Sequence, residues 1–377
     1  MFRRIRRAWQ NNRASQNRPV ATCMNEFYDS LSAQERTSVQ DVALSYGRMI
    51  RTHHQRLLRA KATSTSPYYV GLSSDLSSFT HVTKRVALVA DTMLLSDHGI
   101  GVVQELGLIR ERYGDFAAAM DGTGTESGIE TRRYGMVTRD LAELNQWLLD
   151  AEALLRGGLA WYGPVFIDGS PDAVGDHEVL MDSSRRADPD LLPSFSDRSI
   201  DFLVEHGRAV DLTRSKPLAS RVVRPILEID LPFIDGLRLN DFAQVTVEEF
   251  DSYRQHRDFM RSRLLELDDA LEAVDSQIAL ERVALAIRDE LNAATAEMNS
   301  AARSRALSRS GAVLGTTSAV LAAVRPEALQ STLALSSTIA AGATGLWPTI
   351  QAFADTKAKR THGKWHYVWA LQKKAAR

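Results

Sequence analysis

Glu228 and Asp230 are the two residues whose types and spacing best suit metal-assisted chemistry. They stand two positions apart in ILEIDLPFIDG, where apolar and charged residues alternate and predict a strand, so both carboxylates would face the same side of it. With Asp235 or Asp241 they could hold a divalent cation for phosphodiester hydrolysis. Pro232 occupies the position where such nucleases usually carry a lysine, and a solvated strand explains the same pattern, so we prefer that simpler interpretation.

Histidines occur at three places that could suggest a metal site. His53 and His54 are adjacent on a predicted helix, so they point about 100° apart and cannot bind one ion from one face. Residues 176–178 read Asp-His-Glu inside a predicted acidic loop, where solvated side chains are the simpler interpretation. His362 and His366 have a spacing that suits a helix-borne metal pair, but the surrounding lysines and the missing acid favour a basic interfacial helix. We predict neither a metal nor a cofactor.

A single cysteine limits redox and metal chemistry. Cys23 can form neither an internal disulfide nor a cysteine-based zinc site, so a reducing, cytoplasmic location fits best and Cys23 is predicted to be a packing residue. The basic N-terminus continues into polar residues, and we expect no secretory signal there. The sequence has no Gly-x-Ser-x-Gly elbow, no P-loop and no dinucleotide fingerprint.

Composition is typical of a soluble globular protein. The 377 residues are 44% hydrophobic and 25% charged, which argues against a disordered chain, a collagen and a polytopic membrane protein. The 46 Lys and Arg residues nearly balance the 47 Asp and Glu residues, giving a net charge of −1. A dedicated nucleic-acid binder would normally be clearly basic, so the sequence carries no strong nucleic-acid signal.

The segment from Gly311 to Ala354 is the most unusual part of the sequence, because only Arg325 and Glu327 are charged within it. Its first limb is too short to span a bilayer comfortably, whereas residues 328–354 are long enough for a tilted crossing. Small residues with spacing that allows close helix contact are Gly315, Ser318, Ala322, Ala341 and Gly345. Ser, Thr, Gly and Ala also dilute the hydropathy, and a buried soluble hairpin would give a similar pattern, so both interpretations stay open.

Basic and aromatic residues follow this apolar pair and could contact a membrane or another anionic surface. They are Lys357, Lys359, Arg360, Lys364, Trp365 and Trp369.

The elements that would carry these residues predict an α+β, predominantly α-helical fold. We expect a basic arm at 1–20, a mixed α+β domain at 21–245, a long helix or helical hairpin at 246–308 and the apolar hairpin with its basic aromatic tail at 309–377. Within the mixed domain, helices are predicted over about 25–62, from Val102 to Ile109 and over 136–156.

Local signals refine this layout. Ser32 and Glu35 match a capping box, LAWYGPVFI reads as a strand, and residues 168–196 read as an acidic loop. Thr246, followed by two glutamates, predicts the start of the long helix.

Two segments of the chain resemble a recurring part of uncharacterised bacterial helical proteins. They are LPFIDGLRLNDFAQVTVEEFDSYRQHRDFMRSRLLEL and the tail KWHYVWALQKK. In these a Pro-apolar-x-x-Gly turn leads into an acidic helix, and an Ala/Gly-rich apolar pair is followed by a basic, tryptophan-containing end. The resemblance implies a shared architecture without a named activity, and some such proteins look like effectors of accessory or defence loci.

The favoured function is a non-enzymatic bacterial effector or interaction protein that associates with a membrane, with itself or with a protein partner through the C-terminal hairpin. It would be cytoplasmic, peripheral or hairpin-anchored at the inner membrane. The alternatives are a metal-dependent nuclease or hydrolase that uses Glu228 and Asp230, and a soluble helical scaffold.

Overall fold

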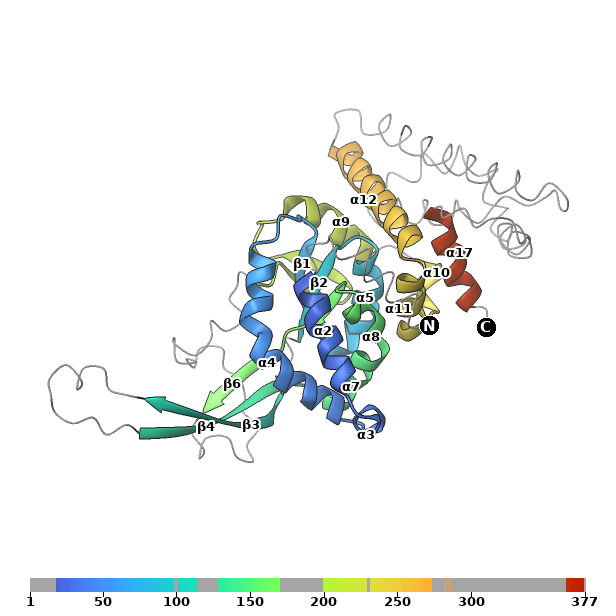
Figure 1. The fold of residues 1–377 in the computed structure, drawn as a ribbon. Coiled ribbons are helices and arrows are strands. Elements are labelled where there is room, and N and C mark those ends of the chain that lie inside the picture. The colour runs from blue at the N-terminus through green and yellow to red at the C-terminus, as the bar shows by residue number, and fades with distance from the viewer. Residues whose placement is uncertain are drawn as a thin grey trace.

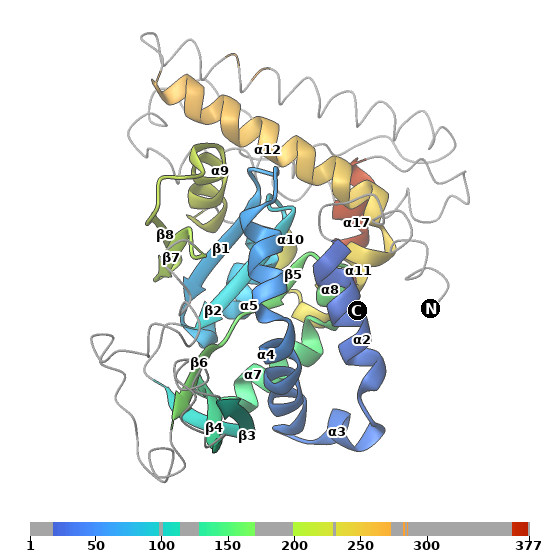
Figure 2. The ribbon, with the colours of Figure 1, turned by 60° about the vertical axis from the view of Figure 1, so that its left-hand side comes forward.

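The computed structural model describes residues 18–97, 101–113, 128–169, 199–228, 231–272 and 364–375, together with Arg282 and Leu285. At its centre lies a five-stranded sheet in the order β5-β2-β1-β7-β8 (Figure 1; all five strands are labelled in Figure 2). Its first four strands are parallel and β8 is antiparallel to β7. Their bounds are β1 Tyr69–Ser74, β2 Thr92–Asp97, β5 Ala160–Tyr162, β7 Phe202–Glu205 and β8 Arg208–Asp211.

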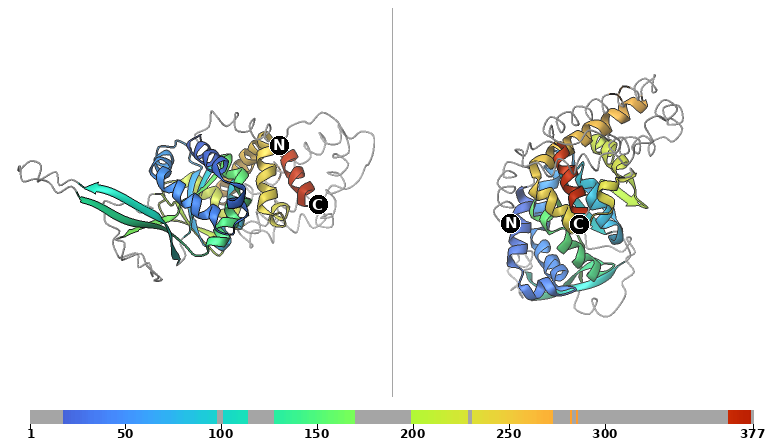
Figure 3. Two further views of the ribbon diagram at one scale, coloured as in Figure 1. Left: turned by 60° about the horizontal axis from the view of Figure 1, so that its bottom comes forward. Right: turned by 90° about the vertical axis from the view of Figure 1, so that its right-hand side faces the viewer.

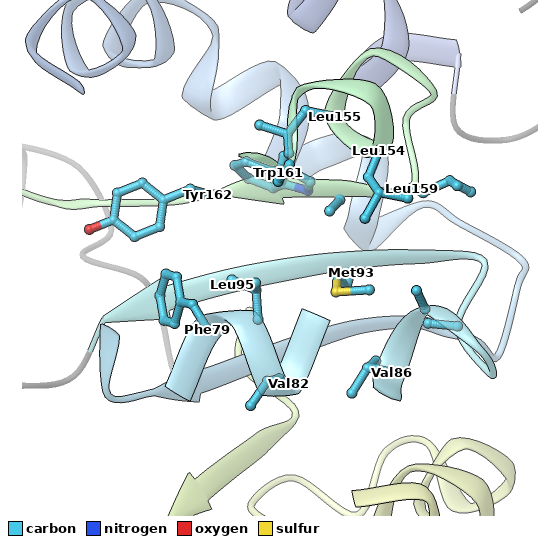
Figure 4. Close-up of a cluster of buried hydrophobic side chains, with 14 of the residues drawn as sticks. Phe79, Val82, Val86, Met93, Leu95, Leu154, Leu155, Leu159, Trp161 and Tyr162 are labelled. Carbon is cyan, nitrogen blue, oxygen red and sulfur yellow. The ribbon is translucent and has the colours of Figure 1, made fainter. Parts of the chain in front are cut away.

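Both faces of the sheet centre are covered. Every residue of β1, β2 and β5 is buried, which is why these strands read as short apolar runs without alternation. Helix α5 (Phe79–Ala87) connects β1 to β2, and Figure 4 shows its Phe79, Val82 and Val86 lying close to β2. Trp161 and Tyr162 belong to the neighbouring strand β5. Trp161 lies beside Leu154 and Leu155 of α8 (Glu152–Arg156), and the Tyr162 ring packs on Phe79 of α5 at 5.9 Å.

A second, three-stranded antiparallel sheet has the order β3-β4-β6. Its strands are β3 (Val102–Tyr113), β4 (Gly128–Thr138) and β6 (Val165–Gly169). Strands β3 and β4 form a long ribbon that projects from the body of the molecule (Figures 1 and 3). The predicted helix from Val102 to Ile109 is therefore wrong, because long-range pairing with β4 overrides a short helical spacing of apolar residues.

The N-terminal helical prediction is confirmed in its main features. The segment folds as α2 (Arg18–Ser30), α3 (Ala33–Thr37) and α4 (Asp41–Ala62). The predicted capping box is present, because the Ser32 hydroxyl accepts from the Glu35 backbone N–H and the Glu35 carboxylate accepts from the Ser32 backbone N–H. The helix predicted over 136–156 is present as α7 (Leu141–Asp150) and α8, although β4 continues to Thr138. LAWYGPVFI contributes two strands, β5 and β6.

The strand predicted around Glu228 is wrong. Residues Pro217–Glu228 form helix α9, whose buried residues recur at helical spacing. These are Ala219, Val222, Val223, Ile226 and Leu227. The alternation of apolar and charged residues that suggested a strand begins only at the C-terminal end of this helix.

Thr246 does not begin a helix. It lies in α11 (Leu239–Glu248), where its Oγ1 donates to the carbonyl of Phe242 at 2.8 Å, and the next helix, α12 (Phe250–Glu272), starts after Glu249. The boundary expected between 245 and 246 therefore falls inside α11. Beyond Glu272, only Arg282 and Leu285 of the predicted 246–308 helix are described.

Helix α12 crosses the molecule at the amino ends of β1 and β2 (Figure 2). Its Arg257 and Arg261 each form an ion pair with Asp91, which directly precedes β2, at 3.0 and 2.9 Å. The C-terminal helix α17 (Lys364–Ala375) packs on α10 (Pro232–Asp235), α11 and α12, and buries Tyr367 and Leu371. The carboxyl ends of the strands thus lie on the side away from α12.

The fold is mixed α/β and mainly helical, with two sheets. A largely parallel sheet with helices on both faces is an α/β arrangement, which corrects the expected α+β class. Within the described residues, no helix is long and apolar enough to cross a membrane. The apolar pair at 311–354, with all five of its small residues, lies outside the described residues, as do Lys357, Lys359 and Arg360.

Candidate functional site at the carboxyl edge of the sheet

The acids favoured by the sequence are not gathered into one site. Glu228 is exposed at the end of α9, and Asp230 lies outside the described residues. Asp235 forms an ion pair with Arg85 at 2.9 Å. Asp241 contacts Arg238 at 2.9 Å. These contacts are those of stabilising ion pairs between helices and within them.

The histidines and the cysteine are also held in packing roles. His54 is buried on α4 with its ring edge-on to Phe166 at 5.6 Å, and burial, assisted by the charge of Arg51, lowers its pKa to about 4. The Nε2 of His366 lies 3.2 Å from a carboxylate oxygen of Glu249. Cys23 is buried, as predicted. His362 and residues 176–178 lie outside the described residues.

A different set of polar residues meets where three parallel strands end. Strand β1 ends in Ser73-Ser74 and is followed by Asp75, and strand β2 ends in Ser96-Asp97. Ser74 pairs directly with Asp97, so these two residues lie side by side at the carboxyl edge. Two apolar runs that each end in serine and aspartate were the sequence signal for this edge.

The chain order places this edge beside a reversal of strand order. From β1 the chain crosses through α5 to β2 on one side, while β7 pairs with the opposite side of β1. In open α/β sheets, ligands bind outside the carboxyl ends of the strands at such a reversal.

Arg139 links the two acids. It follows β4, and its backbone N–H donates to an oxygen of Asp97 at 3.3 Å while its guanidinium lies 3.5 Å from Asp75. Asp97 is only 8% exposed, whereas the side chains of Arg139 and Asp75 are 61% and 46% exposed. The edge therefore combines a buried carboxylate, that of Asp97, with an exposed carboxylate and an exposed guanidinium.

Three buried hydroxyl groups lie at or next to this edge. Ser74, Thr138 and Tyr162 are each at most 1% exposed. The Thr138 side chain is a hydrogen-bond neighbour of the Tyr162 hydroxyl, whereas the Ser74 hydroxyl has no hydrogen-bond partner within the part of the chain that the structure describes. A buried hydroxyl without a partner costs about 1–3 kcal/mol, so water or a ligand is the expected partner. Burial raises the pKa of Tyr162, and the charge of Asp97 raises it further, so its phenol stays protonated at neutral pH.

Glu143 adds an ionisable group with an altered proton affinity. It lies in the first turn of α7, which Asp140 caps through the backbone N–H groups of Ala142 and Glu143 at 2.8 and 3.0 Å. Burial raises the pKa of Glu143, and the carboxylates of Asp140 and Asp97 raise it further, against the opposing charge of Arg139. A carboxyl group that keeps its proton more readily is suited to donate one.

The described residues contain no group of three or more Asp, Glu, His or Cys side chains placed to hold a metal ion. Magnesium, however, usually binds through one or two carboxylates together with substrate phosphates and water. Asp75 and Asp97 with the surrounding hydroxyls provide oxygen ligands of this kind.

The other buried charges serve the fold. At the opposite end of β1, Asp201 accepts from Lys61 Nζ at 2.8 Å and from the backbone N–H of Gly71 at 2.7 Å. On α5, Lys84 donates to the carbonyl groups of Ile234 and Leu237 at 2.8 and 2.9 Å. Each of these groups is satisfied by a neighbouring element.

No protein-family model matches the chain, and neither a curated protein nor a solved structure is detectably similar to it.

Proposed function

We propose that the chain is a phosphoester hydrolase that binds a divalent cation at the carboxyl edge of its parallel sheet. The observation that carries the proposal is the meeting of the buried Asp97 with the buried hydroxyls of Ser74, Thr138 and Tyr162 at these strand ends. The proposed cation site therefore differs from the one that the sequence suggested at Glu228 and Asp230. Glu228 lies at the exposed end of helix α9.

Asp97 and Asp75 would hold the cation together with a phosphate oxygen and water, which is the ligand set that magnesium prefers. The exposed guanidinium of Arg139 is within reach of a phosphate at the same edge and could stabilise its charge. The cation supplies charge neutralisation and a more acidic water when bound.

The reaction consumes one water molecule. The water oxygen forms a bond to phosphorus and gives up one proton to the solvent. The bond from phosphorus to the leaving oxygen breaks, and that oxygen keeps the bonding electron pair and takes up a proton from a side-chain donor, which the solvent then reprotonates. Glu143, whose pKa is raised by burial and by the carboxylates of Asp140 and Asp97, would be this proton donor.

Hydrolysis of bis-p-nitrophenyl phosphate by the purified full chain, with Mg²⁺ or Mn²⁺, tests the proposal. Asp97→Asn should lower kcat/KM at least 100-fold without lowering the melting temperature greatly, because asparagine has the same shape. Glu228→Gln is the matched control at the site favoured by the sequence and should keep full activity. Absence of hydrolysis with either cation, or a loss in Glu228→Gln alone, would contradict the proposal.

Membrane association or self-association through the apolar pair is a second proposal, and it rests on the sequence of residues 311–354. Because α17 packs into the body, deletion of 311–377 would also remove buried Tyr367. A sharper variant replaces 311–354 by a Gly/Ser linker and keeps α17. Loss of membrane fractionation or of oligomers in this variant supports the proposal, and unchanged behaviour rejects it.

A further inference from the structure

Helix α4 places one face in the core and the other in solvent. Its buried residues recur at helical spacing and include Tyr46, Ile50 and Leu57. The exposed residues from position 48 to the C-cap lie on the opposite side, and apart from Ala62 they fall within an arc of about 100°. We call this set the α4 stripe, and its members are Arg48, Thr52, Gln55, Arg56, Arg59 and Thr63.

The α4 stripe consists only of hydrogen-bond donors. It contains neither an acid nor an apolar side chain, and Asp41 in the first turn is the only acid of the helix. Arg48, Arg56 and Arg59 form no ion pair within the part of the chain that the structure describes. Their positive charges are therefore available to a ligand.

The guanidinium of Arg48 is already held in place. Its Nε donates to the carbonyl of Leu106 on β3 at 2.9 Å, which leaves the two terminal nitrogens for other partners. Glu35 is an acid that interacts with the charge of Arg48. The carboxylate of Glu35, however, is engaged by the hydroxyls of Ser32 and Ser45 at 2.7 and 2.9 Å. A side chain that is oriented before binding loses less entropy when it binds an anion.

We propose that the α4 stripe binds the phosphate backbone of duplex DNA. Arginine, threonine and glutamine are among the side chains that contact phosphate in protein–DNA complexes, and arginine can pair with a phosphate through two hydrogen bonds. From Arg48 to Thr63 the stripe extends roughly 22 Å, and the phosphates of one strand recur about every 3.4 Å along the DNA axis. Each of the three arginines can therefore reach a phosphate of its own. The net charge of −1 does not oppose this, because attraction of a charged ligand depends on the local charge of the surface.

The composition of the stripe favours duplex DNA over other partners. A helix that lies in a membrane surface inserts an apolar face, whereas the apolar face of α4 is buried in the core. Proteins that bind single strands offer aromatic rings to the bases, and the stripe has none. The centre of a protein–protein interface is usually poor in charge. Contacts of the kind that the stripe offers touch phosphates alone, so we expect binding without sequence preference.

The test is the salt dependence of binding of the full chain to a fluorescent 24-base-pair DNA duplex, measured by anisotropy with EDTA present so that no cation-dependent cleavage occurs. Each phosphate that a basic side chain neutralises contributes about 0.9 to the slope of log K against log salt. The triple variant Arg48→Gln, Arg56→Gln, Arg59→Gln should therefore lose up to about 2.7 units of slope. Between 50 and 200 mM salt, wild-type affinity should fall up to about 40-fold more than that of the variant.

The matched control removes the same charge from exposed positions of β8, α9 and α12, through Arg208→Gln, Arg224→Gln and Arg254→Gln. This control should keep the wild-type slope. Equal losses of slope in the two triple variants would overturn the proposal, because DNA would then respond to net charge alone. Tighter binding of a single strand than of the duplex, or stripe-dependent binding of phosphatidylglycerol vesicles in place of DNA, would overturn it too.

A double variant, Arg56→Gln with Arg59→Gln, keeps the bond from Arg48 to Leu106 and so avoids any loss of stability at that contact. It should lose up to about 1.8 units of slope, which is about 12-fold in affinity over the same salt range. A wild-type slope in a double variant with an unchanged melting temperature would overturn the proposal. The inference does not rest on the proposed hydrolase, because binding is measured without hydrolysis.

Discussion

Cys23 lies on α2 with its Sγ 3.2 Å from the Sδ of Met49, and burial, aided by the charge of Glu26, raises the pKa of its thiol to about 12. The thiolate, which is the reactive form, is then about one part in 10,000 at pH 8. Ellman's reagent should label the native chain far more slowly than the denatured chain, and Cys23→Ser should keep any activity. Complete labelling of the native protein within seconds would show that the thiol is accessible.

His54 should make the stability depend on pH. The folded state binds its proton with a pKa of about 4, against an ordinary value of 6.5. Between these values the unfolded chain holds more protons, so the free energy of unfolding falls as pH drops through this window. At pH 5.0 the loss relative to pH 7.5 is about 2 kcal/mol.

Urea denaturation of wild type and His54→Gln at both pH values measures this loss. The difference between the two proteins should change by about 2 kcal/mol in favour of the variant at pH 5.0. A difference that stays constant would mean that His54 titrates alike in the folded and unfolded chains.

At the scale of residues, the sequence predicted the role of Cys23 but not the candidate site. Glu228 and Asp230 suggested a metal site because they are close in sequence. Asp75 and Asp97, in contrast, become neighbours only through the pairing of β1 with β2. An aspartate that ends an apolar run is a detectable signal. Which second residue lies beside that aspartate depends on the order of the strands in the sheet, and a local sequence pattern does not determine this order.

At the scale of elements, Tyr367 fixes α17 to the body. Its hydroxyl lies 2.8 Å from Thr246 Oγ1, and its ring packs edge-on to Tyr253 at 5.4 Å. Tyr367→Ala leaves a cavity between α17 and α12 and should lower the free energy of unfolding by about 3–5 kcal/mol. Tyr367→Phe keeps the ring contact and should cost only about 1 kcal/mol, since Thr246 retains its bond to Phe242.

Thermal and urea unfolding of both variants test this docking. Lys373→Ala, at an exposed position of α17, is the control and should change stability by less than about 0.5 kcal/mol. If Tyr367→Ala were as stable as this control, α17 would not be packed on the body in solution.

The bond from Asp201 to Lys61 and to the backbone of Gly71 ties α4 to β1 and β7. Both side chains are nearly fully buried, at 2% and 5% exposure. Asp201→Ala leaves a buried ammonium and a buried N–H without their acceptor and should cost about 3–5 kcal/mol. Adding Lys61→Met should restore part of this loss, which chemical denaturation would measure. A strictly additive double variant would show that the two residues do not interact.

Local signals predicted some elements well. Ser32 and Glu35 located a helix start, because a capping box depends only on neighbouring residues. Helix α9 was missed because the alternation at its end resembled a strand, and β3 was missed because its partner strand, β4, is not adjacent to it in the sequence. Pairing over such distances is decided by tertiary contacts.

At the scale of the whole molecule, structural and candidate functional features occupy opposite ends of the parallel sheet. Helix α12, with Arg257 and Arg261 bound to Asp91, covers the amino ends. The carboxyl ends carry Asp97 and the three buried hydroxyls, and the ribbon extends from the same end (Figure 2). Among the described residues, the amino ends are therefore covered by an ion-paired helix, and the carboxyl ends offer the ligand groups.

Titration of the full chain with Mn²⁺ in the presence of inorganic phosphate, followed by the electron paramagnetic resonance signal of free Mn²⁺, measures cation binding at the carboxyl edge most directly. We expect saturable binding by wild type and by Glu228→Gln, and a Kd at least 10-fold higher for Asp97→Asn, because one of two carboxylate ligands is lost. The same Kd for Asp97→Asn as for wild type, or no saturable binding at all, would contradict a cation site at these strand ends.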